Sequence, residues 1–215
     1  MKHILSCLII IAAFNFSFGQ EAYFSMGHNF TTYDYTNSEG ESNENIEGSS
    51  GSAYELGYVF SLGEKLGLAT GLTLNEFNAT GGTMVSNYSW KTNYLGFQGV
   101  VKYAVFGESQ ANRSSWVSRR TGFGLNFNAG ANVNHIINGQ QKINGQTFDL
   151  TNEVEFKGVF VQPLLGLDAR YYILNVLALG VGYHYSKSFG LTNSTPQKLN
   201  FNNSQLQFNI IMSLN

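Results

Sequence analysis

The sequence predicts an all-β protein, an eight-stranded antiparallel up-and-down transmembrane β-barrel. Two observations support this prediction. Apolar residues alternate with small or polar residues along eight segments, and a helical period of 3.6 residues fits none of them. Charged residues make up only 12% of the chain of 215 residues, which is about half the share found in a soluble globular domain. An ordinary cytosolic enzyme surface is therefore not expected.

Residues 1–19 are predicted to be a secretory signal peptide, and residues 20–215 the barrel domain. A basic residue at position 2 precedes an apolar run that is too short to cross a bilayer as a mature helix. Small residues lie just before the expected cut after Gly19. The cut removes Cys7, the one cysteine of the sequence, so no disulfide or thiol chemistry is expected in the mature chain.

Eight strands are expected from the alternation. In the fifth, apolar residues take every second position from Phe123 to Val133, and glycine and asparagine take the positions between them. The last strand alternates in the same way from Leu206 to Leu214. No helical segment separates the strands, so neighbours pair in antiparallel order within one domain. The strands are placed at 22–36, 52–62, 65–78, 90–106, 120–137, 155–172, 176–189 and 202–214.

The connections between these strands alternate in length. Those after the first, third, fifth and seventh strands are polar and about ten residues or longer, while those after the second and sixth are tight. This pattern is typical of an outer-membrane barrel with both termini on the periplasmic side. The connection 107–119, after the fourth strand, is longer than the pattern requires. Pro163 falls inside a strand of a barrel without free edges, so a local bulge is expected there.

The polar face of the strands indicates a membrane barrel rather than a soluble one. Glycine, asparagine, serine, glutamine and threonine dominate this face, whereas a soluble barrel would carry lysine and glutamate there. Along the runs 54–62, 66–74, 123–133 and 206–214 the apolar face carries no formal charge, as contact with lipid requires. An eight-stranded lumen is filled by side chains, so no passive pore is expected. Five tyrosines share the lipid-facing parity: Tyr58, Tyr103, Tyr171, Tyr183 and Tyr185.

Two stretches of the sequence are informative beyond their alternation. The first, residues 93–103, begins Asn-Tyr-Leu and ends Lys-Tyr; the second joins Tyr-His-Tyr at 183–185 to Gly-Leu-Thr-Asn at 190–193. Together with the signal peptide, the glycine-rich strands and the apolar last strand, they resemble the bacterial outer-membrane protein β-barrel domain family, which includes PorT-like proteins. The resemblance implies an integral outer-membrane protein, sometimes linked to protein secretion, without a defined active site.

Charged residues on the inward face are expected to form a structural ion-pair network in the lumen. An isolated charge in a closed lumen is costly unless it is paired. A proton or solute pathway is the alternative interpretation. The residues are Glu55, Lys102, Asp168 and Arg170.

The first long loop is acidic, with no basic residue between its carboxylates. Clustered carboxylates suit hard divalent cations near lipopolysaccharide phosphates, or a basic partner. Their spacing matches no EF-hand, and a solvated loop is the simpler interpretation. The acidic residues are Asp34, Glu39, Glu41, Glu44 and Glu47.

The overlong fourth connection contains three arginines and a tryptophan, Arg113, Trp116, Arg119 and Arg120. Basic side chains suit the anionic headgroups of the inner leaflet, and a tryptophan suits the membrane interface. Docking of a protein partner is the alternative interpretation.

His184 and Ser186 resemble the His-x-Ser pair of lipid A deacylase barrels, which hydrolyse an acyl chain with a serine nucleophile, a histidine base and an acidic partner. Here, however, His184 shares the inward parity, and no glutamate follows Glu155 to orient it. A polar lumen residue is therefore the favoured interpretation. The other histidines are scattered and the mature chain is expected to lack cysteine, so no metal site is expected.

The sequence thus predicts a monomeric integral protein of the cell outer membrane that acts through its extracellular loops, without catalysis or a cofactor. The expected partners are outer-membrane lipids, lipopolysaccharide and an unidentified protein. Fourteen acidic and twelve basic residues do not favour nucleic acid. Two alternatives stand beside this prediction: a lipid-modifying hydrolase of the outer membrane, and a soluble periplasmic barrel whose apolar face lines a small-molecule site.

Overall fold

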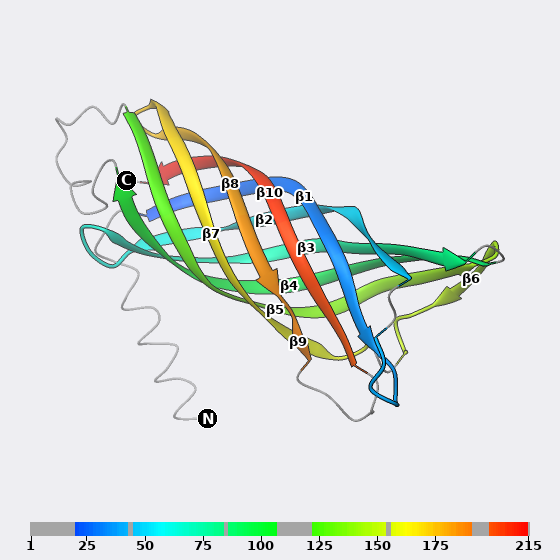
Figure 1. Ribbon diagram of the computed structural model, residues 1–215. Coiled ribbons are helices and arrows are strands. Elements are labelled where there is room, and N and C mark those ends of the chain that lie inside the picture. The colour runs from blue at the N-terminus through cyan, green and yellow to red at the C-terminus, as the bar shows by residue number, and fades with distance from the viewer. Residues whose placement is uncertain are drawn as a thin grey trace, which may run out of the picture.

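The computed structural model describes residues 20–42, 45–83, 86–106, 122–153, 156–190 and 198–214, which form one antiparallel sheet (Figure 1). No helix among these residues is long and apolar enough to span a membrane. The strands are β1 (Gln20–Thr36), β2 (Ile46–Ser61), β3 (Leu66–Thr83), β4 (Ser86–Phe106), β5 (Gly122–Ile143), β6 (Gln146–Asp149), β7 (Val159–Leu174), β8 (Leu177–Lys187), β9 (Phe189–Gly190) and β10 (Lys198–Leu214).

The sheet closes into a ring of eight long strands. Neighbours pair in chain order, β5 pairs with β7, and β1 pairs with β10 over its whole length. Closure gives every strand of the ring two partners, so no open edge is left. Gln20 lies opposite Leu214 at the end that also carries the tight β2–β3 and β7–β8 connections, which we call the turn end (Figure 1). The predicted eight-stranded antiparallel barrel is confirmed.

Alternate residues of each strand point to opposite sides of the wall because the side-chain period of a strand is two. In β5, Asn126, Asn128 and Asn132 are buried in the lumen, whereas Phe127 and Val133 point outward and are exposed. The assignment of faces predicted from the sequence is therefore confirmed. The five tyrosines predicted to face outward all lie on the outer wall and are 44–56% exposed.

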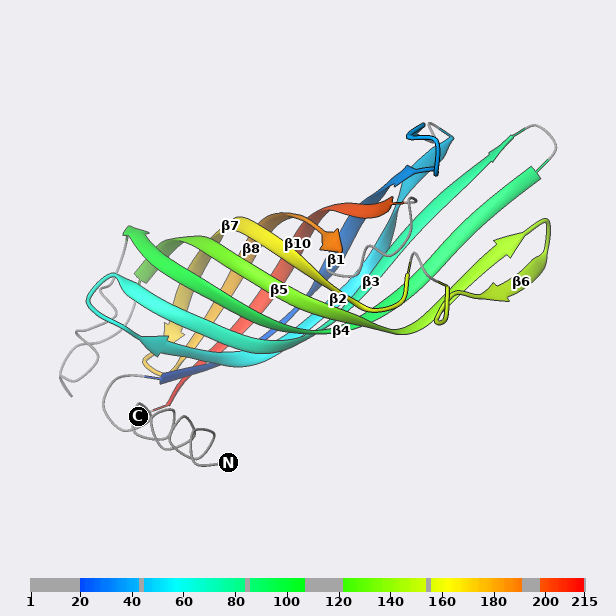
Figure 2. The same cartoon turned by 90° about the horizontal axis from the view of Figure 1, so that it is seen from below.

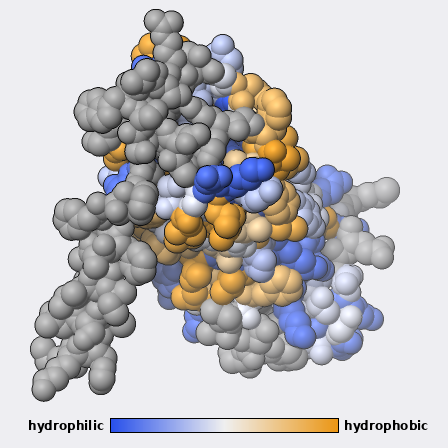
Figure 3. Space-filling view, turned by 90° about the vertical axis from the view of Figure 1, so that its left-hand side faces the viewer, coloured by the Kyte–Doolittle hydropathy of each residue, from blue (hydrophilic) through white to orange (hydrophobic). Residues whose placement is uncertain are grey.

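The outer wall is an apolar surface. Leu56, Leu72 and Phe97 lie side by side on β2, β3 and β4 and are 62%, 58% and 56% exposed. Figure 3, which views the barrel from its turn end, shows hydrophobic side chains gathered in patches over the outside. Such a surface is far larger than the apolar patches that soluble monomers expose. The alternative of a soluble binding barrel does not fit, because the residues that would line its interior lie on the outside.

The lumen has two layers of different chemistry, where the sequence predicted small and polar residues throughout. The layer near the turn end is polar and charged. The layer toward the opposite end is aromatic, with ring centroids 4.8 Å apart between Tyr33 and Phe201 and 5.0 Å apart between Tyr94 and Phe160. Phe77 packs against the same rings and is fully buried. We call these five residues the aromatic layer.

Protruding hairpins, rather than long irregular loops, form much of the other end, which we call the hairpin end (Figure 2). The prediction of a long polar loop after the third strand is wrong, because β3 and β4 remain paired as far as Thr83 and Ser86. The loop after β5 likewise continues into β6 through Asn144 and Gly145, which both have positive φ angles of 48° and 88°. An Asn-Gly pair with this backbone forms a type I′ hairpin turn.

The bulge predicted at Pro163 is also wrong. The β5–β7 register is continuous through the pair Ala131 and Pro163. Pairing on the other side of β7 is instead interrupted between Leu164, opposite Ser186 of β8, and Val161, opposite Phe189 of β9. A proline lacks the N–H group that a ladder needs, so a gap in the ladder on one side accommodates it without a bulge.

Candidate functional site

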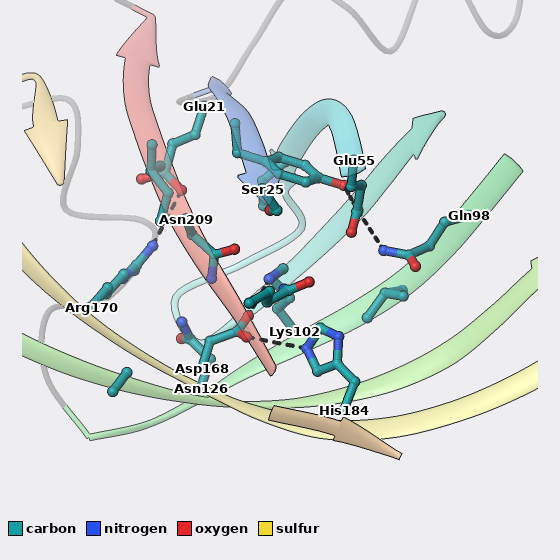
Figure 4. A pocket seen from close by; sticks show the side chains of 16 residues that line it. Glu21, Ser25, Glu55, Gln98, Lys102, Asn126, Asp168, Arg170, His184 and Asn209 are labelled. Carbon is teal, nitrogen blue, oxygen red and sulfur yellow. Dashed lines mark hydrogen bonds and ion pairs between the residues drawn. The ribbon is translucent and has the colours of Figure 1, made fainter. Parts of the chain in front are cut away.

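The polar layer of the lumen contains an ion pair between strands that are not adjacent (Figure 4). Lys102 Nζ on β4 lies 2.5 Å from Asp168 Oδ2 on β7, and His184 Nε2 on β8 lies 3.1 Å from Asp168 Oδ1. Glycines provide the space for these groups. A Cβ atom at Gly166 would overlap the His184 ring, and one at Gly182 would overlap the Asp168 carboxylate.

A second ion pair includes an acid that the sequence did not predict. Arg170 Nη1 lies 3.2 Å from Glu21 Oε2, and Tyr172 donates a hydrogen bond of 2.9 Å to Glu21 Oε1. Glu21 is 1% exposed and Arg170 6% exposed. Glu21 was missed because the first strand was placed from residue 22. Its inward parity with Tyr23 and Ser25 was the available signal.

Glu55, the remaining predicted member of the network, is held by neutral donors. Tyr23 donates its hydroxyl hydrogen to Glu55, and the Gln98 side-chain amide donates a second hydrogen bond. The four predicted residues therefore lie around the same small cavity, together with Glu21 and His184, but they do not form one continuous chain of ion pairs. Their joint structural role stays a prediction.

The lumen is closed along its length in the part of the chain that the structure describes. Its polar layer encloses two cavities of about 20 and 10 Å³, which is roughly the space of a single water molecule each. The aromatic layer seals the lumen toward the hairpin end. The arrangement offers no continuous path for a solute.

A planar lipid bilayer containing the purified protein is expected to show no stable open-channel steps, because charged side chains and packed rings occupy the lumen. Single-channel current recording checks this expectation, with a large porin reconstituted in the same way as the positive control. Reproducible steps that disappear when the protein is omitted would contradict a closed lumen.

The pair His184 and Ser186 lies in the lumen, and its geometry does not favour a hydrolase. His184 contacts Asn128 and Asp168 at 3.1 Å each, while Ser186 accepts a hydrogen bond of 3.0 Å from Gln162. Asp168 is thus an acidic partner of His184, and the sequence did not predict this contact. The cavity beside both residues measures about 10 Å³, which leaves no room for the acyl chain of a lipid substrate.

Two of the acidic residues predicted in the first loop contact other polar side chains. Asp34 lies 3.7 Å from Lys187, and Glu41 accepts a side-chain hydrogen bond from Asn37. Glu39 and Glu47 are exposed. Among the described residues, no group of three or more His, Cys, Asp or Glu side chains could hold a metal ion. A solvated surface remains the simpler interpretation of this loop.

Several predictions fall on parts of the chain outside the described residues. They are the signal peptide at 1–19, Glu44 of the acidic loop, and the headgroup or partner contact of Arg113, Trp116, Arg119 and Arg120. These stay predictions.

A cavity of about 420 Å³ lies at the hairpin end, within the size range of ligand pockets. Tyr33 of the aromatic layer forms part of its lining, with the centroids of Trp90 and Phe156 6.2 and 6.3 Å from the Tyr33 ring. Its position depends on the β5–β6 hairpin, which folds back so that the Leu150 N–H donates to the Gly139 carbonyl at 2.9 Å. The sequence did not predict this cavity.

A closed eight-stranded ring with an apolar outer wall and a polar, filled lumen defines the class of small outer-membrane β-barrels. Outer-membrane protein OprG of Pseudomonas aeruginosa has the same fold, with a TM-score of 0.56 at 10% identity over 92% of this chain and 97% of that one. The resemblance to small eight-stranded outer-membrane barrels is thereby confirmed at the level of the fold. No protein-family model and no curated protein matches the sequence.

Two other solved structures are more distant. Neisserial surface protein A matches at 11% identity over 89% of this chain and 97% of that one, with a TM-score of 0.46. The outer membrane enzyme PagL matches at 11% identity over 84% of this chain and 97% of that one, with a TM-score of 0.37.

Proposed function

We propose that the protein is an integral, monomeric outer-membrane barrel that acts through its hairpin end, exposed to the cell exterior, and that it performs no catalysis. The observation that carries this proposal is the division of the molecule along its axis. The wall suits lipid and side chains fill the lumen, whereas the hairpin end is formed by protruding paired strands and contains a cavity of about 420 Å³.

Lipids are the first partner that this proposal implies. The outward charged residues Glu76 and Lys187 lie at the level of the aromatic layer, next to Phe77 and opposite Asn202. The charged side chains of the described wall closer to the turn end point inward, and these residues are Glu21, Glu55, Lys102, Asp168 and Arg170. An outward charge at this depth would be costly. Lipopolysaccharide and an unidentified protein are proposed as partners of the hairpin end.

Membrane placement is tested by separating the membranes of the native host and running the outer-membrane fraction unheated and boiled on one dodecyl sulfate gel. We expect the protein in this fraction with a mobility that changes on boiling, because a closed barrel resists the detergent until it is heated. Recovery from the soluble periplasm would contradict the proposal.

The orientation is tested by single cysteines at the two ends in a Cys7→Ser background. Ser38→Cys places a thiol between β1 and β2 at the hairpin end, and Gly63→Cys places one in the β2–β3 turn; both positions are exposed. A membrane-impermeant maleimide added to intact cells is expected to label only the first. The reverse pattern would put the hairpin end in the periplasm.

A further inference from the structure

The cavity at the hairpin end is walled by apolar and aromatic side chains from several distant segments. β1, β2, β4, β5, β6, the segment after β6 and the start of β10 all contribute to it, so it exists only in the folded barrel. Tyr33 of the aromatic layer forms the part of its lining that is shared with the lumen. The lining residues are Tyr33, Tyr35, Ile46, Trp90, Gln141, Ile143, Phe148, Asp149, Leu150, Glu153, Phe156 and Leu199.

The charged residues of the described lining are all acidic. Asp149 and Glu153 bring two carboxylates to the cavity, and the described residues that line it include no lysine, arginine or histidine. Both carboxylate-bearing residues are exposed at the hairpin end. A ligand with a positive charge would therefore meet attraction at the cavity mouth and no competing base in the lining.

The aromatic side chains also favour a positively charged ligand. Tyr35 and Trp90 line the cavity beside Phe156, and the faces of such rings attract cations. Phe148, which is 46% exposed, supplies apolar surface near the mouth. An apolar body carrying one cationic group would thus match both the walls and the carboxylates.

The Asp149 carboxylate is held in its ionised form. The Thr151 backbone N–H and hydroxyl donate hydrogen bonds of 2.8 and 2.6 Å to Asp149 Oδ1. These bonds lower the pKa of Asp149 below its ordinary value, because they stabilise the charged form. Asp149 therefore remains negative at neutral and mildly acidic pH.

We propose that this cavity binds a small amphiphilic amine, with the apolar part of the amine against the aromatic wall and its ammonium group facing Asp149 and Glu153. The proposal deepens the proposed function by naming a ligand class for the hairpin end. It rests on that function only for access from the cell exterior, and binding itself depends on the folded barrel alone.

Three probes of matched size and different charge test the proposal on the purified barrel in a non-ionic maltoside detergent. They are 4-phenylbutylamine, 4-phenyl-1-butanol and 4-phenylbutyrate, which are cationic, neutral and anionic at neutral pH. Trp116→Phe leaves Trp90 as the one tryptophan, and its fluorescence reports occupation of the cavity. We expect the amine to bind about tenfold more tightly than the alcohol, as one charge-assisted contact provides, and the acid to bind most weakly.

Variants that lack the carboxylates test whether Asp149 and Glu153 cause the preference for the amine. The double variant Asp149→Asn and Glu153→Gln is expected to bring the affinity for the amine to that of the alcohol, while the alcohol binds as before. Glu39→Gln with Glu41→Gln, which removes two carboxylates outside the cavity, is the matched control and should change neither affinity. Each variant is first checked for heat-dependent gel mobility, so that only folded barrels are compared.

The possible results of these experiments lead to different conclusions. Equal binding of the three probes, preference for the alcohol, or no change in Trp90 fluorescence with the amine would overturn the proposal. Loss of discrimination in the control variant would overturn the assignment to Asp149 and Glu153. A barrel that binds the amine when purified but is labelled at the wrong end in cells would keep the ligand class and overturn the proposed function.

Discussion

Replacing Arg170 by methionine is expected to lower the free energy of unfolding by about 3–5 kcal/mol, the cost of breaking a buried ion pair from one side. Glu21 is 1% exposed, and Arg170 supplies a cation 3.2 Å from its carboxylate. The variant removes this cation and leaves the carboxylate buried in the lumen, where the Tyr172 hydroxyl still donates to it. Guanidinium titration of the barrel folded in lipid vesicles, followed by tryptophan fluorescence, measures the change.

A double variant separates the pair from the packing of its members. Glu21→Gln combined with Arg170→Met removes both charges and should recover much of the loss, because replacing both partners of a buried pair is often close to neutral. Lys91→Met is the matched control, since Lys91 is 70% exposed and 3.2 Å from Glu76, and exposed pairs contribute about 0–1 kcal/mol. An Arg170→Met loss no larger than that of Lys91→Met would contradict a structural role for the pair.

Replacing Leu72 by arginine is expected to lower the free energy of unfolding in vesicles by about 2–4 kcal/mol, the cost of a charge near the bilayer midplane. Leu72 is 58% exposed, points outward and lies between Leu56 and Phe97 in the apolar wall. The arginine would have to leave lipid or draw water into it. Guanidinium titration in vesicles again provides the measurement.

Thr80→Arg is the control for this variant. Thr80 is exposed on the same strand, beyond the aromatic layer and toward the hairpin end. We expect its substitution to cost about 0–1 kcal/mol, as is typical near or outside the interface. Similar small costs at both positions would mean that the wall meets water, because exposed substitutions in soluble proteins usually stay within about 0.5 kcal/mol.

Parts of the hairpin end were predictable, and others were not. Asn144-Gly145 is a strong local signal for a two-residue hairpin, but the prediction of a long polar loop after the fifth strand overlooked it. The extension of β3 and β4 had no comparable signal, because Gly81 and Gly82 read as a loop. The backbone pairing of Gly81 with Tyr88 and of Gly82 with Asn87 overrides that local preference.

The contacts in the lumen were also only partly predictable from the sequence. The inward parity of Lys102 and Asp168 was readable from the alternation, because parity is a local property of a strand. Their contact was not, since it depends on how far each strand is shifted along its neighbour around the ring. Arg170 and Glu21 show this most clearly, because 149 positions separate them in the chain.

By itself, the sequence determined the all-β class, the eight long strands, the outward and inward faces and the small-barrel architecture, because the two-residue period that reveals them is a local property of each strand. The tertiary structure alone decided the pairing of lumen charges, the aromatic layer and the cavity beneath the β5–β6 hairpin. These features depend on strand register and ring closure, which bring residues such as Tyr33, Phe156 and Phe201 together from distant parts of the chain.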